Sequence, residues 1–346
     1  MAMNKKVVVA MSGGVDSSVA AYLLKQVGYN VVGVTLQMQP DSGSVIEDAR
    51  LAAESLSIPH YTVDAESVFK ERVIDRFISE YVSARTPNPC IVCNRHVKWA
   101  LLMNKAQELG ADYIATGHYA RVSRNAEGRF TLQRSGAGKK DQTYALYNLT
   151  QAQLAKTLMP LGNIEKHEVR RIAAEIGLAI ADKPDSQDIC FIPDGDYGRF
   201  VREHSNEELL PGNFIDPAGN IIGTHQGITG YTIGQRRGLK SGFGRRIYVT
   251  DIDPVTRNIT LSDNSALFSD RLTVSDINFV HIGGFTGEIR AEGKIRYAAT
   301  PAACSVSYEN GLLRVKFDEP QRAATPGQAA VFYRDGYALF GGTIVR

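Results

Sequence analysis

The first half of the chain alternates between stretches with the spacing of buried strands and stretches with the spacing of helices. Residues 7–11 read VVVAM, a short apolar run without charge that is typical of a strand buried on both faces. Apolar residues then recur at helical spacing over 19–24, and Gly28 is placed to end that helix. The pattern predicts a strand, a tight turn and a helix at the start of the chain.

The same alternation continues to about residue 116. Repeated strand and helix units predict an α/β fold with a parallel, doubly wound, Rossmann-like sheet, which binds its ligands at the carboxyl ends of the strands. The turn after residue 11 lies at such an end. Further strands are predicted at 31–36, 60–63 and 111–116, and helices at 45–56, 67–83 and about 95–109, with a break at 86–89.

The sequence pattern changes after about residue 200. Glycines and prolines separate short segments up to about residue 268, which predicts a small, turn-rich central domain. Alternating stretches follow at 289–297, 303–308, 312–317 and 329–333, and short strands with turn signals between them predict a C-terminal β-barrel. We therefore expect a catalytic domain over 1–198, a central domain over 199–268 and a barrel over 269–346.

Composition and charge exclude only a few classes of protein. The 346 residues are 43% hydrophobic and 22% charged, and the formal net charge is +2, so any nucleic-acid binding must rest on local patches. No leader-like or membrane-spanning run is visible, which favours a cytoplasmic protein. Two basic runs stand out, although such runs are also typical of plain solvated surface: residues 121–140, with Arg121, Arg124, Arg129, Arg134, Lys139 and Lys140 against Glu127, and residues 236–246, with Arg236, Arg237, Lys240, Arg245 and Arg246.

The turn after the first strand reads SGGVDS, from Ser12 to Ser17. Its two glycines let the backbone approach a ligand closely, and the free N–H groups at the start of the next helix favour an anion such as phosphate. The loop lacks the GxxxxGK[ST] pattern of kinase-like NTPases. It resembles instead the pyrophosphate-binding loop of N-type ATP pyrophosphatases, which transfer AMP to an oxygen. The alternative is a plain helix start with a Gly-Gly N-cap, in which Ser12 or Asp16 closes the first turn.

The cysteines are candidates for the chemistry that follows activation by ATP. Cys90 and Cys93 form a CxxC in a loop that opens a helix, where the helix N-terminus would favour a thiolate. Cys190 lies in a loop-like stretch, and Cys304 follows two alanines in a predicted barrel strand, where a small buried hydrophobe is expected. In a reducing compartment, cysteines in such loops are more often catalytic or metal-binding than part of a disulfide framework.

Seven motifs together resemble the bacterial tRNA-specific 2-thiouridylases, a family of the N-type ATP pyrophosphatase superfamily. They span almost the whole chain: AMSGGVDSS, TPNPCIVCN, ATGHYAR, KKDQTYAL, KPDSQDICFIP, YTIGQRRGL and IRY. The resemblance implies an ATP-dependent enzyme that adenylates O2 of the wobble uridine of tRNA and then replaces that oxygen with sulfur, releasing AMP and pyrophosphate. It further implies tRNAs for lysine, glutamate and glutamine as substrates, and a persulfide-relay protein or cysteine desulfurase as sulfur donor.

The resemblance also assigns roles to residues. Cys190 resembles the persulfide carrier and Cys93 the nucleophile that frees sulfide or closes a transient disulfide, which accords with the weak electrophilicity of C2 of uridine. The ATP-binding residues implied are Ala10, Met11, Ser12, Gly13, Gly14, Val15, Asp16, Ser17, Leu36 and Gly117. The tRNA-facing residues implied are Asn88, Pro89, Cys90, His118, Lys140, Asp141, Gln142, Arg296, Tyr297 and Gln328.

One departure from the family concerns Cys90, where many members carry Asp. Cys90, Cys93 and Cys190 are together compatible with three ligands of a [4Fe–4S] cluster whose open iron binds sulfide, and less well with zinc. A cluster-free persulfide route is the alternative. Mg²⁺ would accompany ATP, with Asp16 as its candidate ligand or, alternatively, as a helix cap.

Three other functions compete with sulfur transfer. The first is another ATP pyrophosphatase, such as an amide-forming synthetase or a lysine-adding tRNA enzyme, which needs no paired cysteines. The second is a non-catalytic tRNA-binding module, which would leave the SGGVDS loop unused. The third is a structural metal protein built on the CxxC.

Overall fold

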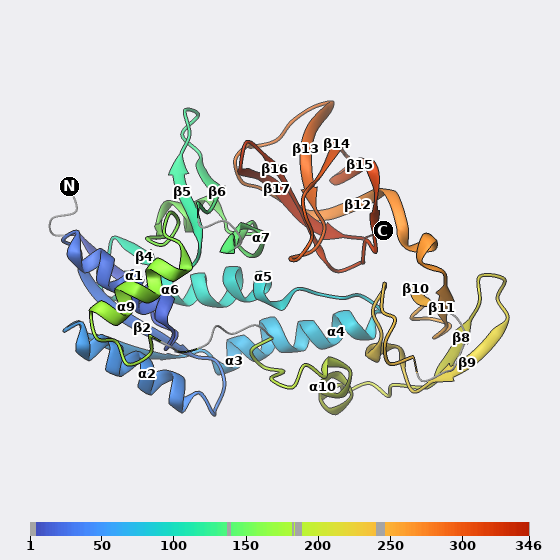
Figure 1. Ribbon diagram of the computed structural model, residues 1–346, viewed down its shortest axis with the longest axis horizontal. Helices are drawn as coiled ribbons and strands as arrows, with labels where there is room; N and C mark the ends of the chain where they lie inside the picture. Colours follow the sequence, from blue (N-terminus) through green and yellow to red (C-terminus); the bar gives the residue numbers. More distant parts are fainter. Residues whose placement is uncertain (1–4, 137–139, 182, 184–188, 240–245, 346) are drawn as a thin grey trace.

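The computed structural model describes residues 5–136, 140–181, 183, 189–239 and 246–345. Within these residues the chain forms an α/β part, a small four-stranded part and a barrel (Figure 1). The α/β part contains β1 (Lys6–Ala10), α1 (Val15–Gln26), β2 (Asn30–Gln37), α2 (Gly43–Ser55), β3 (His60–Asp64), β4 (Tyr113–Ala115), β7 (Thr157–Leu158) and α9 (Lys166–Glu175).

The α/β sheet is parallel and doubly wound, as predicted. Its strand order is β3-β2-β1-β4-β7, and every neighbouring pair is parallel. Val7 and Val9 of β1 pack against α1, α2 and α9, whereas Val8 faces the opposite layer. Because the chain turns from β1 to β2 on one side and places β4 on the other, a crevice opens at the carboxyl end of β1.

Two long helical stretches lie beneath the barrel. The first is α3 (Glu66–Phe69), η1 (Lys70–Asp75) and α4 (Arg76–Val82), and the second is α5 (Pro89–Cys93), η2 (Asn94–Lys98) and α6 (Trp99–Glu108). Both η segments are π-helical. The prediction that the second helix begins near residue 95 is wrong: it begins at Pro89, because Asn88 accepts a hydrogen bond from the N–H of Cys90 and proline suits the first helical position.

The central part is a small antiparallel and parallel sheet. It follows α10 (Tyr197–His204) and has the strand order β10-β11-β8-β9. Its core contains Phe214, Val249 and Leu261. Its elements are β8 (Gly212–Ile215), β9 (Ile221–His225), η4 (Ile228–Gly230), β10 (Tyr248–Ile252) and β11 (Ile259–Ser262).

The predicted barrel is confirmed as a closed ring. The order β12-β15-β14-β13-β16-β17 is closed by pairing of β17 with β12. Cys304 is fully buried in the barrel core, as expected of a packing residue. After η5 (Asn264–Leu267) the strands are β12 (Phe268–Phe279), β13 (Glu288–Lys294), β14 (Ala302–Glu309), β15 (Leu312–Arg322), β16 (Ala329–Arg334) and β17 (Tyr337–Ile344).

A hairpin from the first half of the chain extends the barrel sheet. It consists of β5 (Ala120–Arg124) and β6 (Phe130–Arg134), and β6 pairs with β17 through Gln133 and Tyr337. The short helices α7 (Thr143–Leu146) and α8 (Gln151–Ala155) follow the hairpin. This hairpin explains part of the first basic run, because Arg129 donates to the carbonyls of Phe279 and Val280 and Arg134 lies over the ring of Tyr333. Lys139 in this run, and Lys240 and Arg245 in the second, lie outside the described residues.

Among the described residues, no helix is both long and apolar enough to cross a membrane.

Candidate active site

The SGGVDS loop joins the carboxyl end of β1 to the start of α1. Gly13 has φ +65°, and a Cβ on it would lie 2.7 Å from the carbonyl oxygen of Val45. Glycine is therefore required there by both backbone conformation and space. The Ser17 hydroxyl donates to the carbonyl of Gly14 at 2.9 Å and accepts from the N–H of Ser12 at 3.2 Å, which holds the loop in a closed turn.

Asp16 does not cap α1. The N-cap is Gly14, and no side chain of the described residues caps the helix. Asp16 Oδ1 instead accepts hydrogen bonds from Tyr119 Oη and from Lys166 Nζ, both at 2.7 Å. The cap is thus a glycine, as that alternative also expects, but neither Ser12 nor Asp16 caps the first turn, and the first-turn N–H groups of α1 remain directed at the loop.

Two lysines that sequence reasoning missed flank this loop. Lys166 comes from the start of α9, and Lys183 donates to the carbonyl of Gly13 at 3.3 Å and pairs with Asp48. Both approach SGGVDS from far along the chain, so local spacing gives no signal for them. Lys183 opens the KPDSQDICFIP motif, which was the available clue; residues 184–188 of that motif lie outside the described part.

The two residues expected beside the adenosine lie on neighbouring strand ends. Leu36 is half-buried near the end of β2, and Gly117 follows β4. A Cβ on Gly117 would lie 2.7 Å from both the carbonyl carbon of Asp16 and the amide nitrogen of Ser17. Gly117 therefore packs directly on the SGGVDS backbone.

Cys90 and Cys93 lie inside α5 rather than ahead of it. Cys90 is exposed, whereas Cys93 is 5% exposed and its Sγ lies 3.9 Å from Met38 Sδ. Burial raises the pKa of the Cys93 thiol to about 11, against the opposing charge of Lys98. The expectation that the helix N-terminus favours a thiolate is therefore wrong for Cys93, because the thiol is buried and desolvation disfavours its charged form.

Cys190 lies close to the CxxC. It is exposed, and its neighbour Phe191 packs in the same apolar cluster as Cys93. Desolvation by the surrounding chain raises the pKa of the Cys190 thiol, and Lys98 again opposes the shift. All four cysteines are free thiols. The structure thus brings Cys90, Cys93 and Cys190 into one neighbourhood.

The three cysteines are not arranged as the ligands of a transition-metal site. In the part of the chain that the structure describes, no three His, Cys, Asp or Glu side chains are grouped so that they could hold a metal ion. The three cysteines therefore do not form a ready ligand set for a cluster or for zinc, which would need convergent thiolates.

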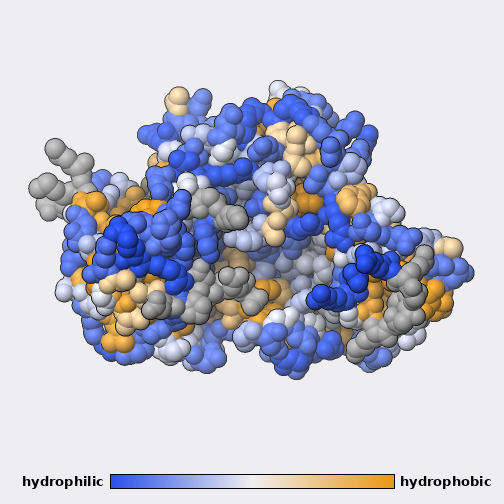
Figure 2. Space-filling view, viewed as in Figure 1, coloured by the Kyte–Doolittle hydropathy of each residue, from blue (hydrophilic) through white to orange (hydrophobic). Residues whose placement is uncertain are grey.

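The barrel meets the start of α5 directly. The N–H of Thr86 donates to the carbonyl of Pro326 at 2.8 Å, and Gln328 Nε2 donates to the carbonyl of Thr86 at 2.8 Å. A Cβ on Gly327 would lie 2.9 Å from Thr86 N, so this contact is tight. The loop that carries Asn88, Pro89 and Cys90 is thereby held against the barrel, and the face between the barrel and the helices below it is recessed (Figure 2).

The expected tRNA-facing residues gather around the same contact. Tyr297 is 49% exposed, and its pKa is raised by burial, by Asp141 and more weakly by Cys90, whereas Lys140 lowers it. Arg296 is exposed and donates to the carbonyl of Arg322. Asp141 accepts from the Thr143 hydroxyl at 2.8 Å, and Gln142 accepts from the N–H of Tyr119 at 2.8 Å, so these two side chains also order their own loop.

His118 lies on the inner side of this region. Its Nδ1 is 2.9 Å from Thr116 Oγ1, and its ring centroid is 5.6 Å from that of Trp99. Burial lowers the pKa of His118 to about 3, and the charge of Lys98 acts in the same direction. The imidazole is therefore neutral near pH 7, able to form hydrogen bonds but carrying no charge for phosphate.

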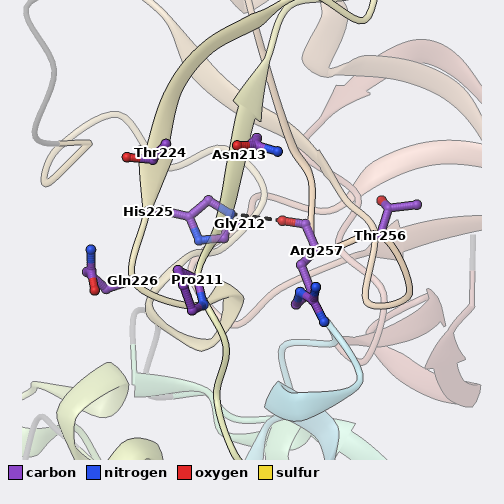
Figure 3. Close-up of a pocket in the computed structure, with 8 residues that line it drawn as sticks. All are labelled: Pro211, Gly212, Asn213, Thr224, His225, Gln226, Thr256 and Arg257. Carbon is purple, nitrogen blue, oxygen red and sulfur yellow. Dashed lines mark hydrogen bonds between the residues drawn. The ribbon is translucent and has the colours of Figure 1, made fainter.

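A cavity of about 400 Å³ in the central part lies apart from these groups. It is lined by His225 and Arg257, among others (Figure 3). His225 Nε2 lies 3.0 Å from the carbonyl of Arg257, and Nδ1 accepts from the N–H of Gly227 at 3.1 Å. Both ring nitrogens hold the local backbone, so this histidine has a structural role.

Known protein families and relatives match this chain over nearly its whole length. Three family profiles match in succession: the tRNA methyl transferase HUP domain over 5–194, the tRNA methyl transferase PRC-barrel domain over 198–263, and the aminomethyltransferase beta-barrel domain over 269–345. Three curated relatives carry the name tRNA-specific 2-thiouridylase MnmA. The protein of Lachnoclostridium phytofermentans is 49% identical, covering 99% of this chain and 100% of the relative. That of Clostridioides difficile is 49% identical over 100% and 99%, and that of Clostridium perfringens 50% identical over 99% and 98%.

Proposed function

This chain belongs to the tRNA-specific 2-thiouridylase family, and we propose that its SGGVDS loop and its cysteines divide the reaction into an activation step and a sulfur step. The chain is an enzyme that uses ATP to place sulfur on a uridine of tRNA. The observation that supports two separate steps is the contact of Gln328 and Pro326 with Thr86. This contact puts the start of α5, which carries Cys90 and Cys93, against the barrel.

In the first step the wobble uridine is activated. Its O2 attacks the α-phosphorus of ATP, pyrophosphate leaves, and the N3 proton passes to solvent. ATP lies on the segment from Ala10 to Ser17, with Leu36 and Gly117 beside the adenosine. The N–H groups at the start of α1, together with Lys166 and Lys183, hold the pyrophosphate charge.

Mg²⁺ bound together with ATP would neutralise phosphate charge. The candidate ligand among the loop residues is Asp16, whose Oδ1 accepts hydrogen bonds from Lys166 and Tyr119. Asp16 therefore orients Lys166, and its carboxylate would be the group that holds the ion.

In the second step sulfur moves from Cys190 to the base. The Cys93 thiolate attacks Sγ of a Cys190 persulfide, the persulfide S–S bond breaks, a Cys93–Cys190 disulfide forms, and HS⁻ leaves. HS⁻ adds to C2, AMP leaves with the electron pair of the C2–O2 bond, and the sulfur-bound proton moves to N3. A dithiol reductant then supplies two electrons to reopen the disulfide. The shared apolar packing of Cys93 and Phe191 supports this pairing.

The tRNA is held where barrel and catalytic part meet. Asn88, Pro89 and Cys90 border the target base, and neutral His118 contributes a hydrogen bond. The outer wall is supplied by Lys140, Asp141, Gln142, Arg296, Tyr297 and Gln328. Exposed Tyr297 suits stacking on an unpaired base, and Arg296 suits a phosphate.

The remaining assignments follow from this chemistry. We propose tRNAs for lysine, glutamate and glutamine as substrates, a persulfide-relay protein or cysteine desulfurase as sulfur donor, and the cytoplasm as the compartment. We also propose functional boundaries near residues 198 and 268, so that 1–198 is catalytic, 199–268 connects, and 269–346 contacts tRNA.

A [4Fe–4S] cluster on Cys90, Cys93 and Cys190 is the alternative sulfur carrier. The described side chains are not grouped to hold such a cluster. Anaerobic purification with iron and labile-sulfide analysis separates the two routes: iron-free protein with full activity excludes the cluster, and activity proportional to bound iron excludes the persulfide route.

The decisive test compares Cys93→Ser and Cys190→Ser with the buried barrel control Cys304→Ala. Purified variants receive ATP, unmodified tRNA and a persulfide donor. We expect both site variants to release pyrophosphate in a tRNA-dependent manner but to form no 2-thiouridine, while the control does both. If both site variants still form 2-thiouridine, the sulfur assignment is wrong and an acceptor other than sulfur must be sought for the activated tRNA.

A further inference from the structure

Lys98 lies on the cysteine face of its helix because of the π-helical turn. In a regular α-helix, residues five apart are separated by about 140° around the axis, since each residue advances about 100°. The N–H of Trp99 instead donates to the carbonyl of Asn94, five residues back, so the turn accommodates one extra residue. That extra residue brings Lys98 to within about 40° of Cys93 and about 20° of Cys90.

The electrostatic surroundings of Lys98 agree with this geometry. Burial lowers the pKa of its ammonium, but the charges of Cys93, Cys90 and Cys190 more than offset that effect, and the net shift is upward. The same lysine lowers the pKa of both Cys93 and Cys190. Lys98 is thus the cation common to all three thiols.

The ammonium has no carboxylate partner among the described residues. Its neighbour His118 is neutral, and none of the ion pairs formed by the described side chains includes Lys98. Lys98 is partly buried, and a cation in such a position without an anion is destabilised unless an anion arrives during the reaction. The groups facing it are thiols, so the anion that fits is reduced sulfur.

We propose that Lys98 forms an anion site for reduced sulfur, in which its ammonium holds the Cys93 thiolate and then the departing HS⁻ next to the activated uridine. This inference rests on the proposed roles of Cys93 and Cys190 and adds a positioning residue that those roles do not include. When Cys93 attacks the persulfide, the negative charge moves from Cys93 Sγ to the terminal sulfur that leaves as HS⁻. A fixed cation beside both sulfurs stabilises the charge at either end of this displacement.

The alternative role for Lys98 is a contact to a tRNA phosphate. Its partly buried position, with the three thiols as its charged neighbours and His118 nearby, argues against it, since phosphate contacts are made at the exposed rim. The two roles predict different losses: a phosphate contact affects tRNA binding, and a sulfur site affects only the second chemical step.

The test uses the full-length enzyme with Lys98→Met, Lys98→Arg and the control Lys105→Met, whose lysine pairs with Glu108 and lies over the ring of Tyr61, away from the cysteines. We expect Lys98→Met to keep tRNA-dependent pyrophosphate release but to lose at least about tenfold in single-turnover 2-thiouridine formation, with partial recovery in Lys98→Arg. Lys105→Met should match the wild type in both steps.

A second readout reports the local charge directly. Cysteine alkylation at one fixed pH is measured with anionic iodoacetate and with neutral iodoacetamide. Lys98→Met should lower the iodoacetate to iodoacetamide rate ratio at Cys93 and Cys190 by at least about threefold. An unchanged ratio, or a raised KM for tRNA with unchanged sulfur transfer, overturns the proposal. Loss of activity in Cys93→Ser alongside an unaffected Lys98→Met would refute this inference while leaving the proposed function intact.

Discussion

Gln328 of the barrel donates a hydrogen bond from Nε2 to the backbone carbonyl of Thr86, two residues ahead of Asn88, at 2.8 Å. The two residues are separated by most of the chain, so this bond fixes how the barrel stands over the thiol-bearing helix. A substitution of Gln328 therefore tests this contact without changing the residues proposed to react.

Replacing Gln328 with Ala should weaken tRNA binding without affecting ATP. Loss of one such hydrogen bond costs about 0.5–1.5 kcal/mol, which corresponds to a rise of about two- to tenfold in KM for tRNA. Gln321→Ala is the matched control, because its side chain donates to the carbonyl of Glu319 on the same barrel. An equal rise in KM for ATP and for tRNA would contradict the assignment of Gln328 to the tRNA side.

Replacing Gly117 with Ala should disable the activation step. The new Cβ would lie 2.7 Å from backbone atoms of Asp16 and Ser17, so the SGGVDS loop must shift. We expect tRNA-dependent pyrophosphate release to fall at least about tenfold, because a shifted loop would misplace ATP relative to the uridine. Gly43→Ala is the control, since a Cβ there meets nothing within 4 Å. Circular dichroism checks that both variants fold, and full activity in folded Gly117→Ala would show that the loop tolerates displacement.

The neutral His118 should make the protein sensitive to acid. Its pKa is lowered from its usual range to about 3, so below about pH 6.5 the unfolded state binds a proton that the folded state does not. The stability linked to this group is present above pH 6.5 and is lost as the pH falls toward 3. Between pH 7 and pH 5 we expect a loss of about 1–2 kcal/mol in the free energy of unfolding.

Urea unfolding at the two pH values measures this loss. His118→Gln should show a smaller decrease between pH 7 and pH 5 than the wild type, whereas His204→Gln, at an exposed position, should leave it unchanged. Identical pH dependence in the wild type and His118→Gln would mean that folding does not lower the pKa of this imidazole.

Cys93 should react slowly with iodoacetamide in the free enzyme. Only the thiolate reacts, and burial raises the pKa of this thiol to about 11, so its rate should rise about tenfold per pH unit across pH 7–10. Exposed Cys90 should be modified first, and tandem mass spectrometry distinguishes the two. In urea the difference should vanish. A plateau in the Cys93 rate below pH 9 in folded protein would argue against the raised pKa.

Local sequence predicted those parts of the molecule whose structure depends on neighbours in the chain. Apolar spacing predicts the strand at 7–11, observed at 6–10, and with it the glycine turn and the following helix, because each is set within a few residues. The pattern places the start of this helix too late, because Asn88 and Pro89 are typical of a break as well as of a cap and a first helical residue.

Features that depend on distant contacts were missed. Lys166 and Lys183 reach the SGGVDS loop from more than 140 residues away, and no periodicity reports such an approach. The Cys93 thiol was expected to ionise readily from its place near a helix start, but its packing against Met38 and the aromatic cluster determines its pKa. The π-helical turn that aligns Lys98 is likewise invisible in a pattern read at 3.6 residues per turn.

The pairing of β6 with β17 has a consequence for how the protein is made. Gln133 and Tyr337 are register partners, and the N–H of Arg134 donates to the carbonyl of Gly336 at 2.8 Å. During translation the β5–β6 hairpin is made long before β17, so the β6 edge stays unpaired until β17 has been synthesised. Chains that stall before residue 337 would expose that edge to other nascent chains, and β17 covers it once it has been made.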